Sequence, residues 1–328
     1  MSKCINNKKI LITGGLGFIG SSLARKLVEH GNTVTVVDSL ISEYGGNPRN
    51  IYDIQGKITV SQSDVRDVTA INNLIQGHDY LFNLAGQTSH LDSMHDPITD
   101  LDINAKAQLS ILEACRKQKP DIRIVFASTR QIYGKPKYLP VDEEHPRNPV
   151  DVNGINKIAG EQYHILYQKV YGIASSVLRL TNTYGPRMRI KDARQTFLGI
   201  WIRNLLQGKP IQVFGDGKQR RDYNYVEDVL DALLIAATEK NAIGNVYNLG
   251  APAPLSLEET AKIMCQKIEG SCYQTVPFPE ERKTIDVGDF ICDYSTFRDQ
   301  FGWEPKVSFE DGIQRSLEYF RGEIEHYI

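Results

Sequence analysis

The sequence contains no uninterrupted apolar run of the roughly 18 residues that a transmembrane helix requires. Its first nine residues, MSKCINNKK, are polar and lead directly into a short apolar segment. A signal peptide would instead place a longer apolar stretch after its positive end. We therefore expect a cytoplasmic protein that has no membrane partner.

The sequence is also poor in cysteine and nearly neutral in charge. Its five cysteines are scattered without a CxxC or Cys/His spacing, so neither a disulfide framework nor a metal site is predicted. The 38 Lys and Arg residues and the 40 Asp and Glu residues give a formal net charge of −2. Nucleic-acid-binding proteins normally carry a basic excess, so we expect no nucleic-acid partner.

A strand–turn–helix–strand pattern occupies the first 38 residues. The apolar runs at residues 9–13 (KILIT) and 33–37 (TVTVV) predict two buried strands. Residues 21–30 have apolar side chains at helical spacing, and Gly31 ends that helix. Such a βαβ unit is typical of parallel sheets.

The alternation of strands and helices continues to about residue 181. Further strands are predicted at residues 57–62, 80–84, 122–127 and 174–180, and helices at residues 70–75, 103–118 and 154–171. This order favours an α/β fold of the Rossmann type, with a doubly wound parallel sheet covered on both faces.

After residue 181 the pattern changes to short elements and loops that are rich in Gly, Pro and charge. Helices are predicted at residues 229–238 and 257–268. We expect a Rossmann domain at 1–181 and a smaller C-terminal α/β substrate-binding domain at 182–328. The boundary is approximate, and the chain is expected to cross back between the domains.

The turn between the first strand and the first helix carries three glycines spaced GxxGxxG, at Gly14, Gly17 and Gly20. Such a turn can present backbone N–H groups and the positive end of a helix dipole to a pyrophosphate. Asp38 ends the second strand, where a carboxylate can accept both ribose hydroxyls and would repel a 2′-phosphate. The pattern therefore favours NAD over NADP.

Two more segments follow predicted strands. Asp64 and Val65 lie where an adenine edge is expected, and Leu84, Ala85 and Gly86 lie beside the expected dinucleotide crevice. Because parallel strands end at the same edge of a sheet, these residues are expected to share the cofactor site with the glycine turn.

These segments and later ones resemble, in order, the extended short-chain dehydrogenase/reductases, in the branch of the NAD-dependent nucleotide-sugar epimerases and dehydratases. The matching segments are Gly14–Gly20, Asp38, Asp64–Val65, Leu84–Gly86, Asn104, Ser128–Gly134, Lys157, Arg179–Arg187, Gly215–Asp222, Arg282 and Phe301–Lys306. The resemblance covers nearly the whole chain and is strongest to the UDP-glucose 4-epimerases.

The resemblance implies NAD as cofactor, a nucleotide-diphosphate sugar as substrate, and a set of residues for each. The implied cofactor contacts are Gly14, Gly17, Phe18, Ile19, Gly20, Asp38, Ser39, Asp64, Val65, Leu84, Ala85, Gly86, Asn104 and Lys157. The implied substrate contacts are Gln87, Arg130, Asn182, Arg221 and Arg282. It also implies a homodimer through the helices around Asn104 and Lys157, with residues 162–170 as one candidate face.

The catalytic set departs from the family pattern at one position. Thr129 and Lys157 occupy the Ser/Thr and Lys positions, but Asn153 occupies the position of the catalytic Tyr. An amide cannot act as a general base. Another base can replace the Tyr: Lys157, a water held by Asn153, or Tyr133 or Tyr163. The chain can also be a redox-impaired relative that only binds, or the substitution can be engineered.

A second departure concerns the reaction. Family 4,6-dehydratases carry an Asp-Glu pair directly after the Thr, where this chain has Arg130 and Gln131. Neither residue can transfer the protons of a dehydration, so epimerisation through a transient keto sugar is favoured. Arg130 could instead pair with the carboxylate of a uronic acid. The segment Leu84–Gln87 also resembles the CDP-sugar 2-epimerases, so both 2-epimerisation of a CDP-sugar and epimerisation of a UDP-uronic acid stay open.

The loop after the fourth predicted strand contains His90, Asp92 and His95. Their spacing allows a metal site, but no further ligands support one. We expect this loop to line the sugar pocket.

Overall fold

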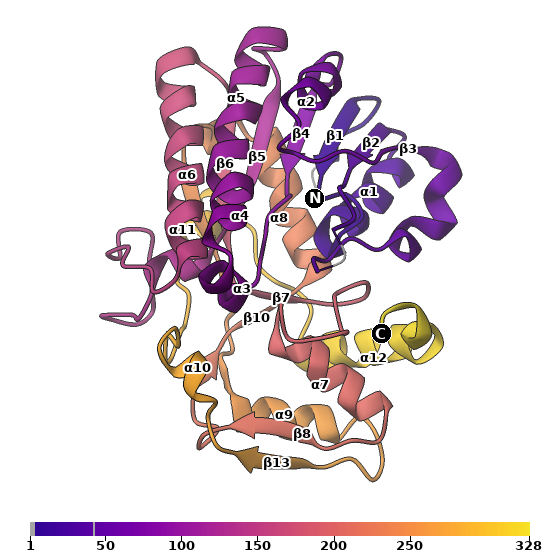
Figure 1. Ribbon diagram of the computed structural model, residues 1–328, viewed down its shortest axis with the longest axis vertical. Helices are drawn as coiled ribbons and strands as arrows, with labels where there is room; N and C mark the ends of the chain where they lie inside the picture. The colour runs from indigo at the N-terminus through magenta and orange to yellow at the C-terminus, as the bar shows by residue number, and fades with distance from the viewer. Residues whose placement is uncertain (1–3, 42) are drawn as a thin grey trace.

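The computed structural model describes residues 4–41 and 43–328 and is built around one seven-stranded parallel sheet (Figure 1). The strand order is β11-β6-β5-β4-β1-β2-β3. The strands of this sheet are β1 (Lys9–Thr13), β2 (Thr33–Val37), β3 (Ile58–Ser61), β4 (Tyr80–Asn83), β5 (Arg123–Thr129), β6 (Ser175–Leu180) and β11 (Val246–Leu249). The expected doubly wound α/β fold is confirmed.

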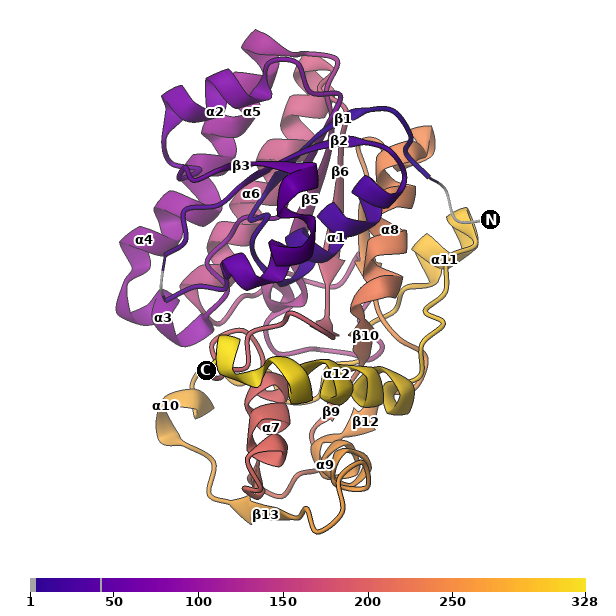
Figure 2. The ribbon, with the colours of Figure 1, turned by 90° about the vertical axis from the view of Figure 1, so that its right-hand side faces the viewer.

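Helices cover both faces of the sheet. One face carries α2 (Val68–Ile75), α4 (Pro97–Leu101), α5 (Ala107–Gln118) and α6 (Val152–Tyr171). The other carries α1 (Phe18–Glu29) and α8 (Val226–Thr238), as Figures 1 and 2 show together. Within the described residues, no helix combines the length and apolarity needed to cross a membrane.

Short elements connect the strands to these helices. They are η1 (Pro48–Lys57), α3 (His90–His95), the π-helical turn η2 (Asp102–Lys106) and η3 (Arg130–Tyr133). The turn η2 joins α4 to α5, so the single helix expected at 103–118 is two segments. Single π turns often occur at functional sites, and η2 contains Asn104.

The smaller part of the molecule is also α/β and lies at the carboxyl ends of the large sheet (Figure 2). Its strands are β7 (Asn182–Tyr184), β8 (Ile211–Phe214), β9 (Arg220–Arg221), β10 (Tyr223–Tyr225), β12 (Leu255–Ser256) and β13 (Tyr273–Val276), which pair two by two. Its helices are α7 (Phe197–Leu206), α9 (Leu257–Cys265), α10 (Glu280–Lys283), α12 (Phe309–Glu323) and η5 (Ile324–His326). Two other short helices from the C-terminal half, η4 (Lys240–Ala242) and α11 (Ser295–Phe301), lie beside β6 and β11 of the large sheet.

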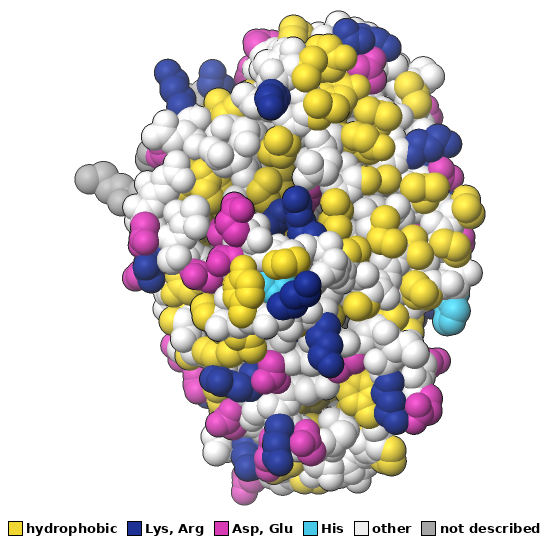
Figure 3. All heavy atoms as spheres, turned by 90° about the vertical axis from the view of Figure 1, so that its left-hand side faces the viewer, with side chains coloured by type: hydrophobic (Ala, Val, Ile, Leu, Met, Phe, Trp, Pro, Cys, Tyr) yellow, Lys and Arg dark blue, Asp and Glu magenta, His cyan; other side chains and the backbone are white. Residues whose placement is uncertain are grey.

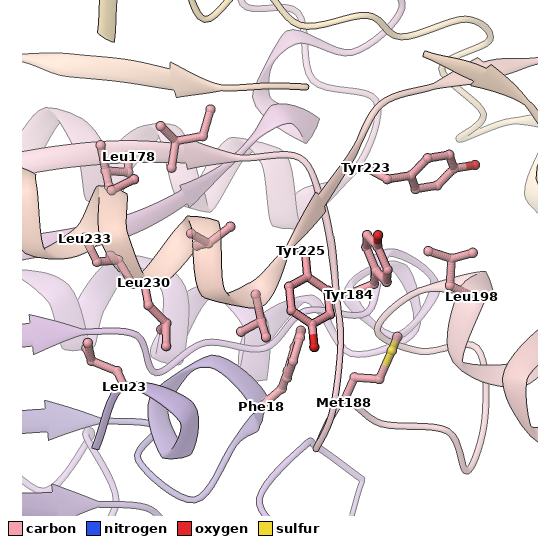
Figure 4. Packing of buried hydrophobic residues seen from close by; sticks show 14 of the residues in the cluster. Phe18, Leu23, Leu178, Tyr184, Met188, Leu198, Tyr223, Tyr225, Leu230 and Leu233 are labelled. Atoms are coloured by element: carbon pink, nitrogen blue, oxygen red, sulfur yellow. The ribbon is translucent and has the colours of Figure 1, made fainter. Parts of the chain in front are cut away.

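One hydrophobic cluster joins the two parts. Figure 4 shows Phe18 and Leu23 of α1 together with Leu230 of α8 and, farther along, Tyr184 and Tyr225. Because these side chains share one core, the smaller part packs directly against α1 and α8. The division at residues 181 and 182 stays a prediction.

Candidate active site

One pocket extends across the carboxyl ends of β1, β2, β4, β5 and β6. Ligands of doubly wound folds bind at this edge, because the loops that leave the strands converge there. The predicted site residues in its wall are Gly14, Gly17, Phe18, Ile19, Gly20, Asp38, Ser39, Asp64, Val65, Leu84, Ala85, Gly86, Gln87, Thr129, Arg130, Asn153, Lys157 and Asn182.

The glycine turn forms one end of the pocket and starts α1 earlier than expected, at Phe18 rather than at residue 21. Gly14 has a φ of +68°, a conformation that residues with a side chain rarely adopt. A Cβ on Gly20 would lie 2.2 Å from the Gly14 carbonyl oxygen. The backbone therefore folds closely on itself at the start of α1, which leaves the helix N-terminus open toward the pocket.

Asp38 holds this turn in place from the end of β2. Its carboxylate accepts hydrogen bonds of 3.0 Å from the backbone N–H groups of Leu16 and Leu40. Burial raises the pKa of Asp38, while these two bonds act against the shift. Each carboxylate oxygen can still accept another hydrogen bond, so the side chain suits a ribose diol in the pocket.

The middle of the pocket is open beside Gly86. A Cβ at that position would lie 2.9 Å from Asn104 Oδ1 and 3.0 Å from Lys157 Nζ. Asn104 lies behind the pocket wall, and its buried Oδ1 has no hydrogen-bond partner within the described part of the chain. Asn104 Oδ1, Lys157 Nζ and the open space beside Gly86 together form what we call the polar cradle. A free acceptor and a positive charge at this place suit the polar groups of the nicotinamide half of NAD.

Lys157 extends from α6 toward this cradle and is 7% exposed. Its Nζ donates to the Ala127 carbonyl oxygen at 3.2 Å and lies 5.0 Å from the centre of the Phe126 ring. Burial lowers the pKa of Lys157 to about 8, although the carboxylates of Asp100 and Glu161 partly oppose this shift. The group is therefore charged at neutral pH and loses its proton just above it.

Thr129 stands at the end of β5, on the same pocket. Its Oγ1 accepts a hydrogen bond of 3.2 Å from the Gln131 N–H, which caps η3. The hydroxyl hydrogen is left to donate to a ligand. Thr129 and Lys157 are thus brought to one pocket, as their family positions require.

Asn153 lies in the same pocket wall, but its side-chain amide already makes hydrogen bonds to other residues of the protein. Its Nδ2 donates to the Gln87 carbonyl oxygen at 2.7 Å and to Asp100 Oδ2 at 3.1 Å. Asn156, one turn further along α6, donates to the other oxygen of Asp100 at 2.8 Å. Asn153 thus ties α6 to α4 and to the loop after β4.

Neither tyrosine that we considered as a replacement base lines the pocket. Tyr133 is fully buried, donates to Asn248 at 2.7 Å and accepts from Arg179 at 2.6 Å. Its pKa is raised, chiefly by burial. Tyr163 packs against the cluster beneath α5. The structure therefore gives no support to either tyrosine as the base, because neither side chain reaches the pocket.

The far end of the pocket is more basic. Arg130 is half-buried, and its Nη1 is buried with no hydrogen-bond partner among the described residues. Burial and then repulsion by the nearby Arg221 lower the pKa of Arg130 to about 10, so it stays charged at neutral pH. Asn182 Nδ2 donates to the Asp222 carbonyl oxygen at 2.9 Å and presents its other face to the pocket.

The last two predicted substrate residues lie outside the pocket wall. Arg221 is buried on β9, donates to the Arg220 carbonyl oxygen at 2.8 Å and lies near Asp286. Arg282 is on α10, with its guanidinium carbon 5.8 Å from the centre of the Phe214 ring. Neither is placed against the pocket in this structure.

The pocket also contains residues that the sequence did not single out. They are Tyr44, Gly45, Gly46, Gln195 and Thr196, from the loops after β2 and before α7. Loops of this kind carry no local pattern, so only their packing shows the connection. His90 lines the pocket as expected for its loop.

Residues 10–250 match the sequence profile of the NAD dependent epimerase/dehydratase family. The UDP-glucose 4-epimerase of Thermotoga maritima, solved with UDP-glucose, is 32% identical, with 96% of this chain and 99% of that one covered and a TM-score of 0.87. The UDP-glucose 4-epimerase of Thermus thermophilus, solved with NAD, is 29% identical, with 96% and 99% covered and a TM-score of 0.85. The UDP-N-acetyl-alpha-D-glucosaminuronate decarboxylase of Bacillus cytotoxicus is 31% identical, with 97% and 99% covered.

The profile spans the glycine turn, the polar cradle beside Gly86 and the Thr129–Lys157 pair, and the similar proteins are matched over nearly their whole lengths. They include more than one reaction on nucleotide sugars. The chain belongs to the NAD-dependent epimerase/dehydratase family, and NAD is its cofactor.

Proposed function

We propose that the protein is a nucleotide-sugar epimerase of the UDP-sugar 4-epimerase kind, which acts through a transient keto sugar. The observation that carries this proposal is the pocket itself: it joins Thr129 and Lys157 to the polar cradle and lacks an acid–base pair after Thr129. The predicted cofactor and substrate contacts are part of the proposal. Two similar proteins are UDP-glucose 4-epimerases.

When bound, NAD⁺ supplies a reversible acceptor for the hydride of one sugar ring carbon. Thr129 positions the hydroxyl of that carbon through its own hydroxyl group. The Lys157 ammonium binds near the nicotinamide ribose and stabilises negative charge on the sugar oxygen as it loses its proton. Rotation of the keto sugar before the hydride returns inverts the carbon.

Dehydration is disfavoured by the two residues after Thr129. Gln131 is buried, and its Nε2 donates to Asp151 Oδ2 at 2.7 Å. An amide in that bond offers no proton of suitable acidity, and Arg130 keeps its proton at neutral pH. The elimination of a hydroxyl group from the neighbouring carbon therefore receives no acid from these two positions.

A second candidate is a UDP-uronic acid epimerase. Its support is Arg130, a charged guanidinium with an unpartnered buried nitrogen at the pocket wall. A carboxylate on the sugar would satisfy that nitrogen by a paired, charge-assisted bond. The similar Bacillus cytotoxicus decarboxylase is named for a uronate substrate, so this substrate class is within the range of the family.

The test is incubation of the protein with NAD⁺ and separate UDP-, CDP-, GDP- and ADP-sugars, including uronic acids, with products followed by ¹H NMR. Conversion of one sugar to its epimer supports the proposal, and the position of the inverted carbon identifies the reaction. Tight binding of one of these sugars without turnover would favour a redox-impaired binding protein. Loss of carbon dioxide from a uronic acid would replace epimerisation by decarboxylation.

We also propose that the protein forms a homodimer through α4, α5 and α6. Figure 3 shows hydrophobic side chains gathered on this face with few charges among them. Ile98 of α4 and Leu166 and Val170 of α6 are 65%, 50% and 57% exposed. The pairing of such faces removes apolar surface from water. Leu166→Glu should convert a dimer to a monomer in light scattering, and an unchanged mass would contradict this interface.

A further inference from the structure

The proposed oxidation needs a group that takes the proton from the sugar hydroxyl. Asn153 cannot do so, and its amide is bonded to Gln87 and Asp100. Lys157 is charged at neutral pH and donates to Ala127. Two further titratable side chains line this part of the described pocket wall, Tyr44 and His90. Burial, followed by the nearby carboxylates of Asp96, Asp92 and Asp100, raises the pKa of Tyr44, so His90 is the better candidate for the base.

His90 is the first residue of α3, which packs against α4 and α6. Its Nδ1 lies 3.0 Å from Asp151 Oδ2. That nitrogen is buried and makes no hydrogen bond within the described residues, while 34% of the side chain is exposed. The exposure therefore belongs to the rest of the imidazole, which lines the pocket.

Asp151 is anchored as a fixed partner for this ring. It is 3% exposed, and its Oδ1 accepts the Gly154 N–H at 2.7 Å as the N-cap of α6. Burial acts to raise the pKa of Asp151, but its contacts with His90, Gly154 and Gln131 together lower it. The side chain is thus a carboxylate whose Oδ2 lies 3.0 Å from His90 Nδ1.

We propose that His90, oriented by Asp151, is the proton acceptor that replaces the family tyrosine. This inference rests on the epimerase function proposed above. A rotation of the ring that directs Nδ1–H at Asp151 would leave Nε2 of the neutral form unprotonated and facing the pocket. Nε2 takes the hydroxyl proton, and the electron pair of the O–H bond forms the carbonyl as the hydride leaves the same carbon for NAD⁺. The reverse transfer returns the proton to the sugar oxygen.

The other charged groups around α3 already have partners. Asp92 on the same helix pairs with Arg194 at 3.1 Å. Asp100 of α4 accepts from Asn153 and Asn156. Among the described residues, Asp151 is thus the carboxylate at contact distance from the His90 imidazole. We therefore expect a change at Asp151 to alter the protonation of His90.

The activity test compares wild type with His90→Ala and uses His95→Ala as the matched control, because His95 is exposed on the same helix. General acid–base catalysis typically contributes about 10²–10⁴-fold. His90→Ala should lower kcat by that factor with little change in substrate KM, and added imidazole should restore part of the loss. His95→Ala should keep the wild-type rate.

A rate for His90→Ala within about threefold of wild type would overturn the inference while the epimerase stands, since the alanine variant has no ring to accept a proton. If wild type itself converts no nucleotide sugar, the proposed function fails, and this role of His90 fails with it.

A second readout needs no turnover. In ¹H–¹⁵N spectra of the wild-type protein, neutral His90 should be protonated at Nδ1 and unprotonated at Nε2. Asp151→Asn keeps an oxygen to cap Gly154 but removes the carboxylate, and it should reduce the population of that tautomer. Observation of Nε2–H as the main neutral form in wild type would contradict the proposal.

Discussion

The amide of Asn153 donates a hydrogen bond of 3.1 Å to the buried carboxylate of Asp100, at the position where the family carries its catalytic tyrosine. The same nitrogen also donates to the Gln87 carbonyl oxygen at 2.7 Å. Asp100 is fully buried, so these bonds and the one from Asn156 satisfy a charge that is otherwise costly. Asn153 therefore has a positive structural role and is more than a missing tyrosine.

Asn153→Asp tests this role with almost no change in shape. The new carboxylate would face the Asp100 carboxylate and the Gln87 carbonyl without a proton to donate. We expect the free energy of unfolding to fall by about 3 kcal/mol, as for a buried polar network that loses its donor. Urea titration of the folded protein measures this loss.

The matched control for this substitution is Asn73→Asp, on the exposed side of α2. It should change stability by less than about 0.5 kcal/mol. Equal effects of the two substitutions would show that the bond to Asp100 contributes nothing specific.

Asp38 should decide the choice of cofactor. Asp38→Asn removes the negative charge at the expected ribose position but keeps one acceptor oxygen. We expect the Kd for NAD⁺ to rise about tenfold and the preference over NADP⁺ to narrow, because repulsion of the 2′-phosphate is lost. Calorimetric titration with both cofactors measures the change, and Asp216→Asn, on an exposed loop, is the control. An unchanged ratio of the two Kd values would contradict a contact between Asp38 and the ribose of the cofactor.

The pKa of Lys157 predicts the direction in which kcat/KM changes with pH. Burial lowers its pKa to about 8, so the ammonium loses its proton as the pH rises through that value. If the charge is what catalysis needs, kcat/KM should fall about tenfold per pH unit above 8, because this parameter reports groups of the free enzyme. A kcat/KM that rises through pH 8 would instead identify neutral Lys157 as the base.

The central sheet could be predicted because its strands are buried on both faces and read as continuous apolar runs, such as KILIT at residues 9–13. Helix α12 could not be predicted from the sequence. Gly312 lies inside it and lowers the helix propensity of the segment, yet a Cβ at this position would lie 2.2 Å from the Tyr184 hydroxyl oxygen. Tertiary packing therefore requires the residue that local propensity disfavours.

The residues of the candidate active site were likewise predictable only in part. The residues that follow strands, such as Asp38 and Gly86, were predictable because parallel strands end at one edge. The contact between His90 and Asp151 was not, because it joins α3 to the N-cap of α6 and neither residue carries a local pattern. The same holds for Tyr44, which reaches the pocket from the loop after β2.

The most direct test of the central claim is the reaction in D₂O with bound NAD⁺ and the sugar that the protein accepts. Hydride that leaves one carbon and returns to it never exchanges with solvent, so NMR should show an epimer with no deuterium at the inverted carbon. Deuterium at that carbon would mean inversion by removal and return of a proton, and it would contradict the keto-sugar mechanism proposed for this pocket.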